Sequence, residues 1–262
     1  MNLHTLIATK NECYIKNNGV SWTPKGIMIH STGANNPYLK RYVGPDDGLL
    51  GENIYKNYWN TYRPDGRQIC CHAFIGKLMD GSIASYQILP WNCMGWNNGG
   101  SSNGTHIAIE ICEDNLTDET YFKKVYAEAV ELAANLCKTY KIAVDNVIDH
   151  SEGYKKGIAS NHGDVAHWFP KFGKSMDTFR ADVDAALRAA EIPKDGETEK
   201  SAVLYRVQVG AFRNKAYAEA MAEKLKGDGY DAIIRIDGDV DGDGKVTAAD
   251  ARATLRKAIG LE

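Results

Sequence analysis

The sequence has no excess of positive charge, since its 31 lysines and arginines are outnumbered by 34 aspartates and glutamates. Proteins that bind nucleic acid through its phosphates usually carry a basic surplus, so nucleic acid is not an expected partner. No apolar run approaches the roughly 20 residues that cross a bilayer, which argues against membrane insertion. Residues 1–15 lack a basic segment followed by a long apolar one, so we expect no secretory signal peptide.

Cysteine is scarce, with six residues scattered between Cys13 and Cys137 and none after that. Cys70 and Cys71 are adjacent, so on a strand their side chains would point to opposite faces and make a poor zinc site. Without a secretory signal, disulfides are not expected. We therefore interpret the cysteines as reduced thiols, several of them in the core.

Strand and helix patterns alternate along residues 1–190. Short apolar or alternating runs predict strands, and apolar residues at helical spacing predict two helices. Strands that alternate with helices are typical of an α/β domain. The expected strands cover residues 25–30, 70–75, 82–88, 106–112 and 142–148, and the expected helices begin near residues 117 and 176.

A second, smaller unit is predicted after residue 190. Residues 191–202 are charged and nearly free of large apolar side chains, so we interpret them as a linker. Residues 203–262 begin with a strand, a helix and a second strand, which predicts a small α/β module. Roughly 60 residues are marginal for independent stability, so a bound ion or a homodimer through this module would stabilise it.

Histidines stand at the ends of two predicted strands, His30 after residues 25–29 and His150 after residues 142–148. Ligands of α/β sheets bind beyond the carboxyl ends of the strands. Two imidazoles at that edge could share a metal ion with a third, hard or anionic ligand. The segment after His150 offers several candidates, and spacing alone does not choose among them: Glu152, His162, Asp164 and His167.

Glu110 lies in the middle of the 106–112 strand, on the face opposite to three isoleucines. Buried acids are rarely unpaired, so this carboxylate is either part of a structural salt bridge or a site group. If its face opens onto a zinc ion, Glu110 can act as the base that takes a proton from water.

A family resemblance is carried by several pieces that occur in a fixed order: GIMIHSTG, CCHAFI, MGW, HIAIEICE and the segment that begins at His150. They resemble the zinc-dependent type 2 N-acetylmuramoyl-L-alanine amidases, a family that includes many phage and prophage endolysins and shares its fold with peptidoglycan-recognition proteins. The resemblance covers about residues 1–190. It implies a central mixed β-sheet flanked by helices, and hydrolysis of the amide between the lactyl group of N-acetylmuramic acid and L-alanine.

The resemblance also implies roles for single residues. His30 and His150 match the first two zinc ligands, and Asp164 in the piece HGDV matches the third. His162 stands where the family has a lysine that stabilises the oxyanion, and Glu110 matches the acid of the central strand. Histidine and valine replace the usual lysine and proline beside Asp164, which leaves His162 as an alternative third ligand.

Three further side chains are candidates for the substrate groove or its support. His72 in CCHAFI matches a family histidine beside the groove, where structural support is the alternative to substrate contact. Trp96 and Trp168 are candidates for lining the groove, with packing as the alternative. His167 we interpret as structural.

The C-terminal unit carries two resemblances. Residues 203–236 resemble the first half of a SPOR domain, a module that binds cell-wall glycan. Residues 239–250, DVDGDGKVTAAD, match the ligand spacing of an EF-hand calcium loop, with glycine at position 6. This loop and its following helix resemble one dockerin repeat, whereas a dockerin has two. The predicted Ca²⁺ ligands are Asp239, Asp241, Asp243, Lys245 through its carbonyl, Thr247 and Asp250.

The sequence therefore predicts a two-domain hydrolase of bacterial peptidoglycan, with a Zn²⁺ amidase domain and a wall-binding module. The expected absence of a signal suits a prophage endolysin that is made in the cytoplasm and released to the wall at lysis. A peptidoglycan-binding protein without catalysis is one alternative, although such proteins lose a zinc ligand. A hydrolase docked to a scaffold through its calcium module is another, although the single repeat argues against it.

Overall fold

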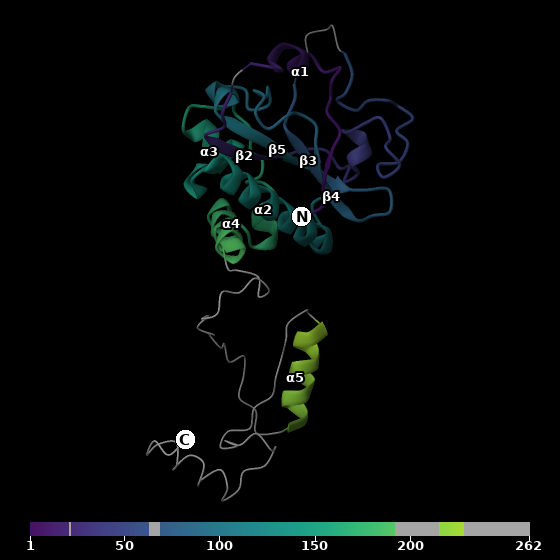
Figure 1. Ribbon diagram of the computed structural model, residues 1–262, viewed down its shortest axis with the longest axis vertical. Helices are drawn as coiled ribbons and strands as arrows, with labels where there is room; N and C mark the ends of the chain where they lie inside the picture. Colours follow the sequence, from purple (N-terminus) through teal and green to yellow (C-terminus); the bar gives the residue numbers. More distant parts are fainter. Residues whose placement is uncertain (21, 63–68, 192–214, 228–262) are drawn as a thin grey trace, which may run out of the picture. The chain divides into compact units, whose positions relative to one another are not determined.

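The computed structural model describes residues 1–20, 22–62, 69–191 and 215–227 (Figure 1). The chain divides into two compact units, Met1–Lys194 and Asp195–Glu262. In the second unit the described residues form one helix, α5 (Lys215–Gly227), which agrees with the helix expected there. Most of the predicted linker, both predicted C-terminal strands and the predicted calcium loop lie outside the described residues.

Six strands of the first unit form one mixed sheet in the order β1-β4-β3-β5-β2-β6. Neighbouring strands are parallel except β3 and β4, which form the predicted antiparallel hairpin. A mixed central sheet flanked by helices confirms the predicted fold class. The strands are β1 (Leu3–Thr5), β2 (Gly26–Ser31), β3 (Ala73–Lys77), β4 (Ile83–Gln87), β5 (His106–Ile111) and β6 (Val147–Asp149).

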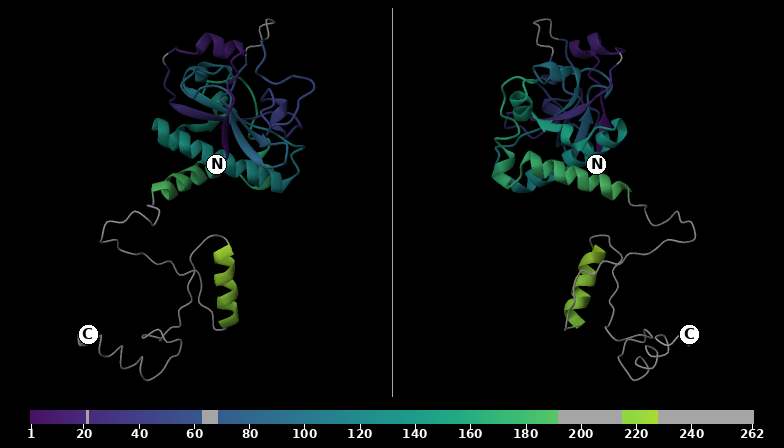
Figure 2. Two further views of the ribbon diagram at one scale, coloured as in Figure 1. Left: turned by 45° about the vertical axis from the view of Figure 1, so that its right-hand side comes forward. Right: turned by 90° about the vertical axis from the view of Figure 1, so that its left-hand side faces the viewer.

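The two faces of the sheet are covered by different elements. On one face, isoleucines of β2 and β5 pack against α2 (Glu119–Tyr140) and α4 (Met176–Glu191). Both helices lie on the same side of the sheet, and α1 (Glu12–Asn17) lies on the other side (Figures 1 and 2). Because side chains alternate along a strand, the residues between these isoleucines point toward the α1 side.

Local sequence signals account for the long helix α2. Asp118 caps its first turn by accepting a hydrogen bond from the Tyr121 N–H at 2.9 Å. Its apolar side chains recur at helical spacing and are buried against the sheet, which contributes about 1.5–3 kcal/mol for each large side chain. Phe122 of this helix packs edge-on against the fully buried Trp168, so Trp168 has the packing role.

The segment from Asp149 to Trp168, for which the sequence predicts no helix, begins with a helix, α3 (His150–Lys155). The Asp149 side chain accepts from the Glu152 N–H, and the Glu152 side chain accepts from the Asp149 N–H. This reciprocal capping box follows from Asp and Glu three residues apart. His150 is therefore the first residue of a helix.

All six cysteines are buried and free, and their burial agrees with the predicted core positions. Five of them lie in the core on the α1 side of the sheet, and Cys137 lies on the buried face of α2, in the core on the other side. Across the described part of the chain, no helix has the length and apolar character needed to span a bilayer.

Candidate metal centre

The sheet fixes His30, the fifth residue of β2, which pairs with β5 on one side and β6 on the other. The side chain is buried, as expected for a central strand. The register places His30 directly beside Glu110 of β5, so both side chains lie on the α1 side of the sheet. The alternation of side chains along β2 and β5 therefore buries the isoleucines on one face and places His30 and Glu110 together on the other.

Helix α3 and its neighbours fix His150. Arg180 of α4 donates to both carboxylate oxygens of the capping residue Glu152, at 2.9 and 3.1 Å. The His150 main-chain N–H donates to the main-chain carbonyl of Asp164 at 3.1 Å. The main chain therefore joins two of the predicted ligands directly.

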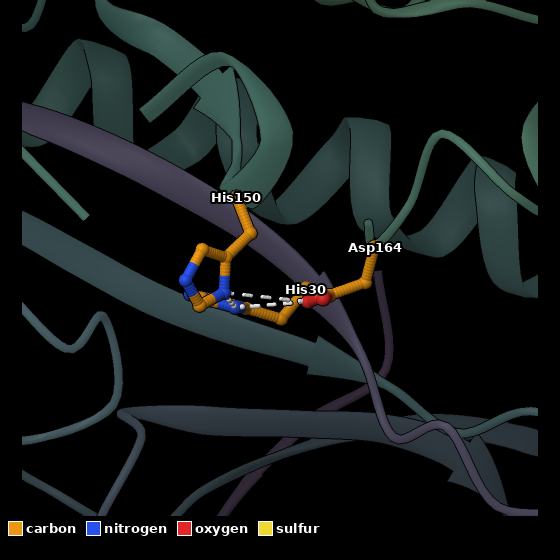
Figure 3. A group of neighbouring side chains, drawn as sticks. All are labelled: His30, His150 and Asp164. Carbon is orange, nitrogen blue, oxygen red and sulfur yellow. Dashed lines mark hydrogen bonds and ion pairs between the residues drawn. The ribbon is translucent and has the colours of Figure 1, made fainter. Parts of the chain in front are cut away.

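Three predicted ligand atoms converge on one point (Figure 3). His30 Nδ1 lies 3.0 Å from His150 Nδ1 and 3.2 Å from Asp164 Oδ2, and His150 Nδ1 lies 3.6 Å from the same oxygen. Zinc bonds of about 2.0–2.1 Å in tetrahedral geometry place ligand atoms about 3.3 Å apart. The three observed separations lie on both sides of that value.

The outer ring nitrogens show which atoms face the centre. His30 Nε2 lies 2.8 Å from Asn98 Oδ1, and His150 Nε2 lies 3.1 Å from Ser160 Oγ. An amide oxygen only accepts, so His30 carries a proton on Nε2, and in the neutral ring the Nδ1 lone pair would be free to bind a metal ion at the centre. Two imidazoles and a carboxylate with this spacing fit a zinc ion, and they are the one such group among the described residues.

Burial and charge oppose each other at this cluster. Burial lowers the pKa of His30, but the hydrogen bond to Asp164 and the charges of Glu110 and Asp164 outweigh it, and the pKa is raised. Burial raises the pKa of Asp164, but its hydrogen bonds with His150 and His30 lower the pKa overall. Asp164 is therefore ionised and attracts positive charge to the centre.

Glu110 is 8% exposed and lies beside the three convergent residues. Its Oε1 accepts from Asn97 Nδ2 at 2.9 Å, whereas its buried Oε2 has no hydrogen-bond partner among the described residues. Burial raises the pKa of this carboxyl, and the charge of His30 acts in the opposite direction. A buried oxygen without a partner is unusual, and its position beside His30 supports a site group over a structural salt bridge.

His162 is exposed at the edge of the cluster. Its ring centre lies 4.6 Å from that of His150, and its Nδ1 lies 3.0 Å from Ser160 Oγ. The ring is close to the centre, but it is not one of the three residues whose ligand atoms converge. This geometry favours Asp164 over His162 as the third ligand.

None of the other predicted residues that the structure describes belongs to the group of convergent ligand atoms. His72 has no exposed surface, and both ring nitrogens bond to main-chain groups, the Cys93 carbonyl and the Ala108 N–H, which favours structural support. Trp96 is half-buried and packs in the α1-side core. His167 pairs with the buried Glu113 at 2.9 Å, as a structural residue would. The predicted calcium ligands lie outside the described residues.

Three site residues were missed from sequence: Asn97, Asn98 and Ser160. They stand in loops without any strand or helix periodicity, and asparagine and serine are common in ordinary turns. Two amides followed by Gly99 and Gly100 are the signal that could have found the first two, since paired glycines allow a close approach of main chains.

The fold and the centre together define an α/β protein with a candidate zinc site beside a buried carboxylate at the strand ends. The family model described as N-acetylmuramoyl-L-alanine amidase matches residues 21–166, more than half of the chain, and the chain belongs to this family. A second model, described as SPOR domain, matches residues 201–250.

Individual relatives agree with this membership. A probable N-acetylmuramoyl-L-alanine amidase of Bacillus licheniformis is 26% identical over 170 residues, which cover 62% of this chain and 42% of the relative. The matched region thus spans about two fifths of that curated relative.

Two solved structures are similar in fold. The Staphylococcus aureus hydrolase AmiA, in complex with its ligand, has a TM-score of 0.52 at 16% identity and covers 72% of this chain and 84% of that chain. A mutant structure of PlyL has a TM-score of 0.50 at 20% identity and covers 71% of this chain and 99% of that chain.

Proposed function

We propose that residues 1–190 form a zinc-dependent amidase that cleaves the bond between the lactyl group of N-acetylmuramic acid and L-alanine in peptidoglycan. The observation that carries the proposal is the convergence of His30 Nδ1, His150 Nδ1 and Asp164 Oδ2 beside Glu110, whose Oε2 has no hydrogen-bond partner in the described part of the chain. Family membership supports the choice of bond. A peptidoglycan-binding protein without catalysis is disfavoured because all three predicted ligands are present.

Each residue has a chemical role in this proposal. His30, His150 and Asp164 would hold the zinc ion, which would supply Lewis-acid polarisation of the amide carbonyl and a bound water with a pKa of about 7. Glu110 accepts the proton of the attacking water at Oε2 and passes it to the leaving amine of L-alanine. His162 donates a ring N–H to the carbonyl oxygen as negative charge develops there.

For the C-terminal unit we propose binding to wall glycan, which the SPOR match supports. The calcium loop at residues 239–250 and a homodimer through this unit stay predictions from the sequence. A role as a phage or prophage endolysin, acting on the wall after release from the cytoplasm, is part of the proposal and is supported by the family resemblance alone.

Two measurements test the proposal: which bond of the cell wall is cut, and which metal ion the activity requires. Purified cell walls are incubated with metal-free protein, with and without added Zn²⁺ or Mg²⁺, and new L-alanine amino termini and new reducing sugar ends are counted. We expect zinc to raise the rate at which amino termini are released by at least about 100-fold. The reason is that a bound metal stabilises the negative charge of the transition state by several kcal/mol.

New reducing ends in place of amino termini, or full activity in metal-free protein, would contradict the proposal. The zinc content of two variants identifies the third ligand in the same experiment. Asp164→Ala is expected to lose zinc and His162→Ala to retain it, whereas the reverse result would make His162 the ligand.

A further inference from the structure

Two uncharged side chains, Asn98 and Ser160, lie behind the imidazoles of the candidate centre. Asn98 Oδ1 is 2.8 Å from His30 Nε2, and Ser160 Oγ is 3.1 Å from His150 Nε2. Each therefore contacts the ring nitrogen that points away from the convergent atoms. We propose that Asn98 and Ser160 are positioning residues that orient both histidines and fix which nitrogen of each ring binds zinc, an inference that rests on the proposed zinc site.

The two residues belong to one connected unit. The Ser160 N–H donates to the Asn98 main-chain carbonyl at 3.1 Å, so their main chains are joined directly. On the other side, Asn103 Oδ1 accepts from the N–H groups of Asn97 and Asn98 at 3.1 and 2.8 Å. The loop around Asn98 and the loop around Ser160 are thus held together, and a shift of one would displace the support of both rings.

The close approach of these loops requires glycine. A Cβ placed on Gly99 would lie 2.2 Å from Ser160 Oγ, and one on Gly100 would lie 2.5 Å from the main-chain oxygen of Ile158. Gly99 also has a φ of +67°, which residues other than glycine rarely adopt. The Ser160 hydroxyl therefore reaches His150 only because position 99 has no side chain.

The positions of the ring protons explain why an amide oxygen and a hydroxyl can orient the two histidines. A cation at the centre needs lone pairs on both Nδ1 atoms, which places the ring protons on Nε2. Asn98 Oδ1 accepts the proton of His30. The Ser160 hydroxyl accepts the proton of His150 and can then donate its own hydrogen to His162 Nδ1, 3.0 Å away.

This pattern gives Ser160 a second consequence. With its Nδ1 accepting from Ser160, a neutral His162 carries its proton on Nε2, and that N–H is the donor that the proposed mechanism assigns to it. One hydroxyl thus links a proposed zinc ligand to the proposed oxyanion donor. Asn98 has no such link among the described contacts, so the two positions are expected to differ in their effect on turnover.

The test is the affinity of the full chain for Zn²⁺, measured by competition with a chromophoric chelator. Asn98→Leu and Ser160→Ala are each expected to weaken zinc binding about 10–100-fold, the usual effect of removing such a partner. Asn98→Asp keeps an acceptor for His30 Nε2 and is expected to bind zinc within about threefold of wild type. In zinc-saturated protein, Ser160→Ala is expected to lower kcat more than Asn98→Leu does.

Ser102→Ala is the matched control. Ser102 donates from its hydroxyl and its N–H to the Ile158 carbonyl, at 2.7 and 3.0 Å, so its hydrogen bonds are directed at the main chain rather than at an imidazole. It joins the same two loops, so we expect its loss to leave zinc affinity within about twofold of wild type, as for a residue outside the ligand shell.

Equal zinc affinity in wild type, Asn98→Leu and Ser160→Ala would overturn the inference while leaving the proposed function intact. Equal losses in Ser102→Ala and Ser160→Ala, or failure of Asn98→Asp to restore binding, would also overturn it, because the effect would then come from loop packing. Absence of zinc binding by wild type would overturn the proposed function and this inference together.

Discussion

The two faces of β2 and β5 differ in chemistry although the same strands form both. On the α2 and α4 side, Ile29 and Ile109 are neighbours in register and are fully buried. One residue farther along each strand, His30 and Glu110 are also neighbours in register, but they lie on the opposite side beside Asp164. A period of two residues thus separates the face that stabilises the fold from the face that carries the proposed chemistry.

The largest expected effect comes from removing the charge on the α1 side. Glu110→Gln should lower amidase turnover about 10²–10⁴-fold, because the proposed base can no longer accept a proton. The free energy of unfolding should stay equal or rise, since the substitution replaces a buried charge with a neutral amide of the same size. Turnover on cell walls and urea unfolding of the same preparation measure both quantities. Unchanged turnover would show that Glu110 is not the base.

On the apolar face, one residue away, we expect the opposite result: a loss of stability with little change in turnover. Ile109→Ala should lower the free energy of unfolding by about 2–5 kcal/mol, because it leaves a cavity in the core beneath α2. Turnover per folded molecule should stay within a few-fold of wild type. Ile54→Ala, at a position 69% exposed, is the control and should change stability by no more than about 0.5 kcal/mol. A loss of turnover as large as that of Glu110→Gln would contradict the separation of the two faces.

A smaller effect is expected from His72, which lies on the α1 side but has a structural environment. Burial lowers its pKa from 6.5 to about 4, so the folded protein resists protonation of this ring more than the unfolded chain does. The stability that depends on the neutral ring is fully present above pH 6.5 and is lost as the pH falls toward 4, by about 2–3 kcal/mol.

Urea unfolding between about pH 7.5 and 4.5, a range that includes most of this titration, checks the prediction. His72→Gln is the comparison, because it removes the titrating group. Between these pH values its free energy of unfolding should fall by about 2–3 kcal/mol less than that of the wild type, whatever its stability at neutral pH. Equal pH dependence in the two proteins would show that His72 is protonated as readily in the folded state as in the unfolded chain.

Periodic segments could be predicted from the sequence, and contacts between loops could not. Alternation in HIAIEIC placed Glu110 opposite the isoleucines, and helical spacing predicted α2 to within a few residues. β1 was missed because three residues are too short to show a period. The start of α3 was missed although Asp149 and Glu152 have the spacing of a capping box. Asn98 and Ser160 meet only through the tertiary fold, which no local pattern records.

The hydrogen bond from the His150 N–H to the Asp164 carbonyl closes the intervening segment into a loop whose ends are fixed by the main chain. The length of that loop is therefore independent of the spacing between the two side chains at the centre. Near Gly157, where the chain is exposed and φ is +70°, residues can be gained at a modest entropic penalty of about 0.6 kcal/mol for each doubling of loop length. Insertions on the exposed side of Gly157 are therefore expected to leave the main-chain link between the two ligands in place.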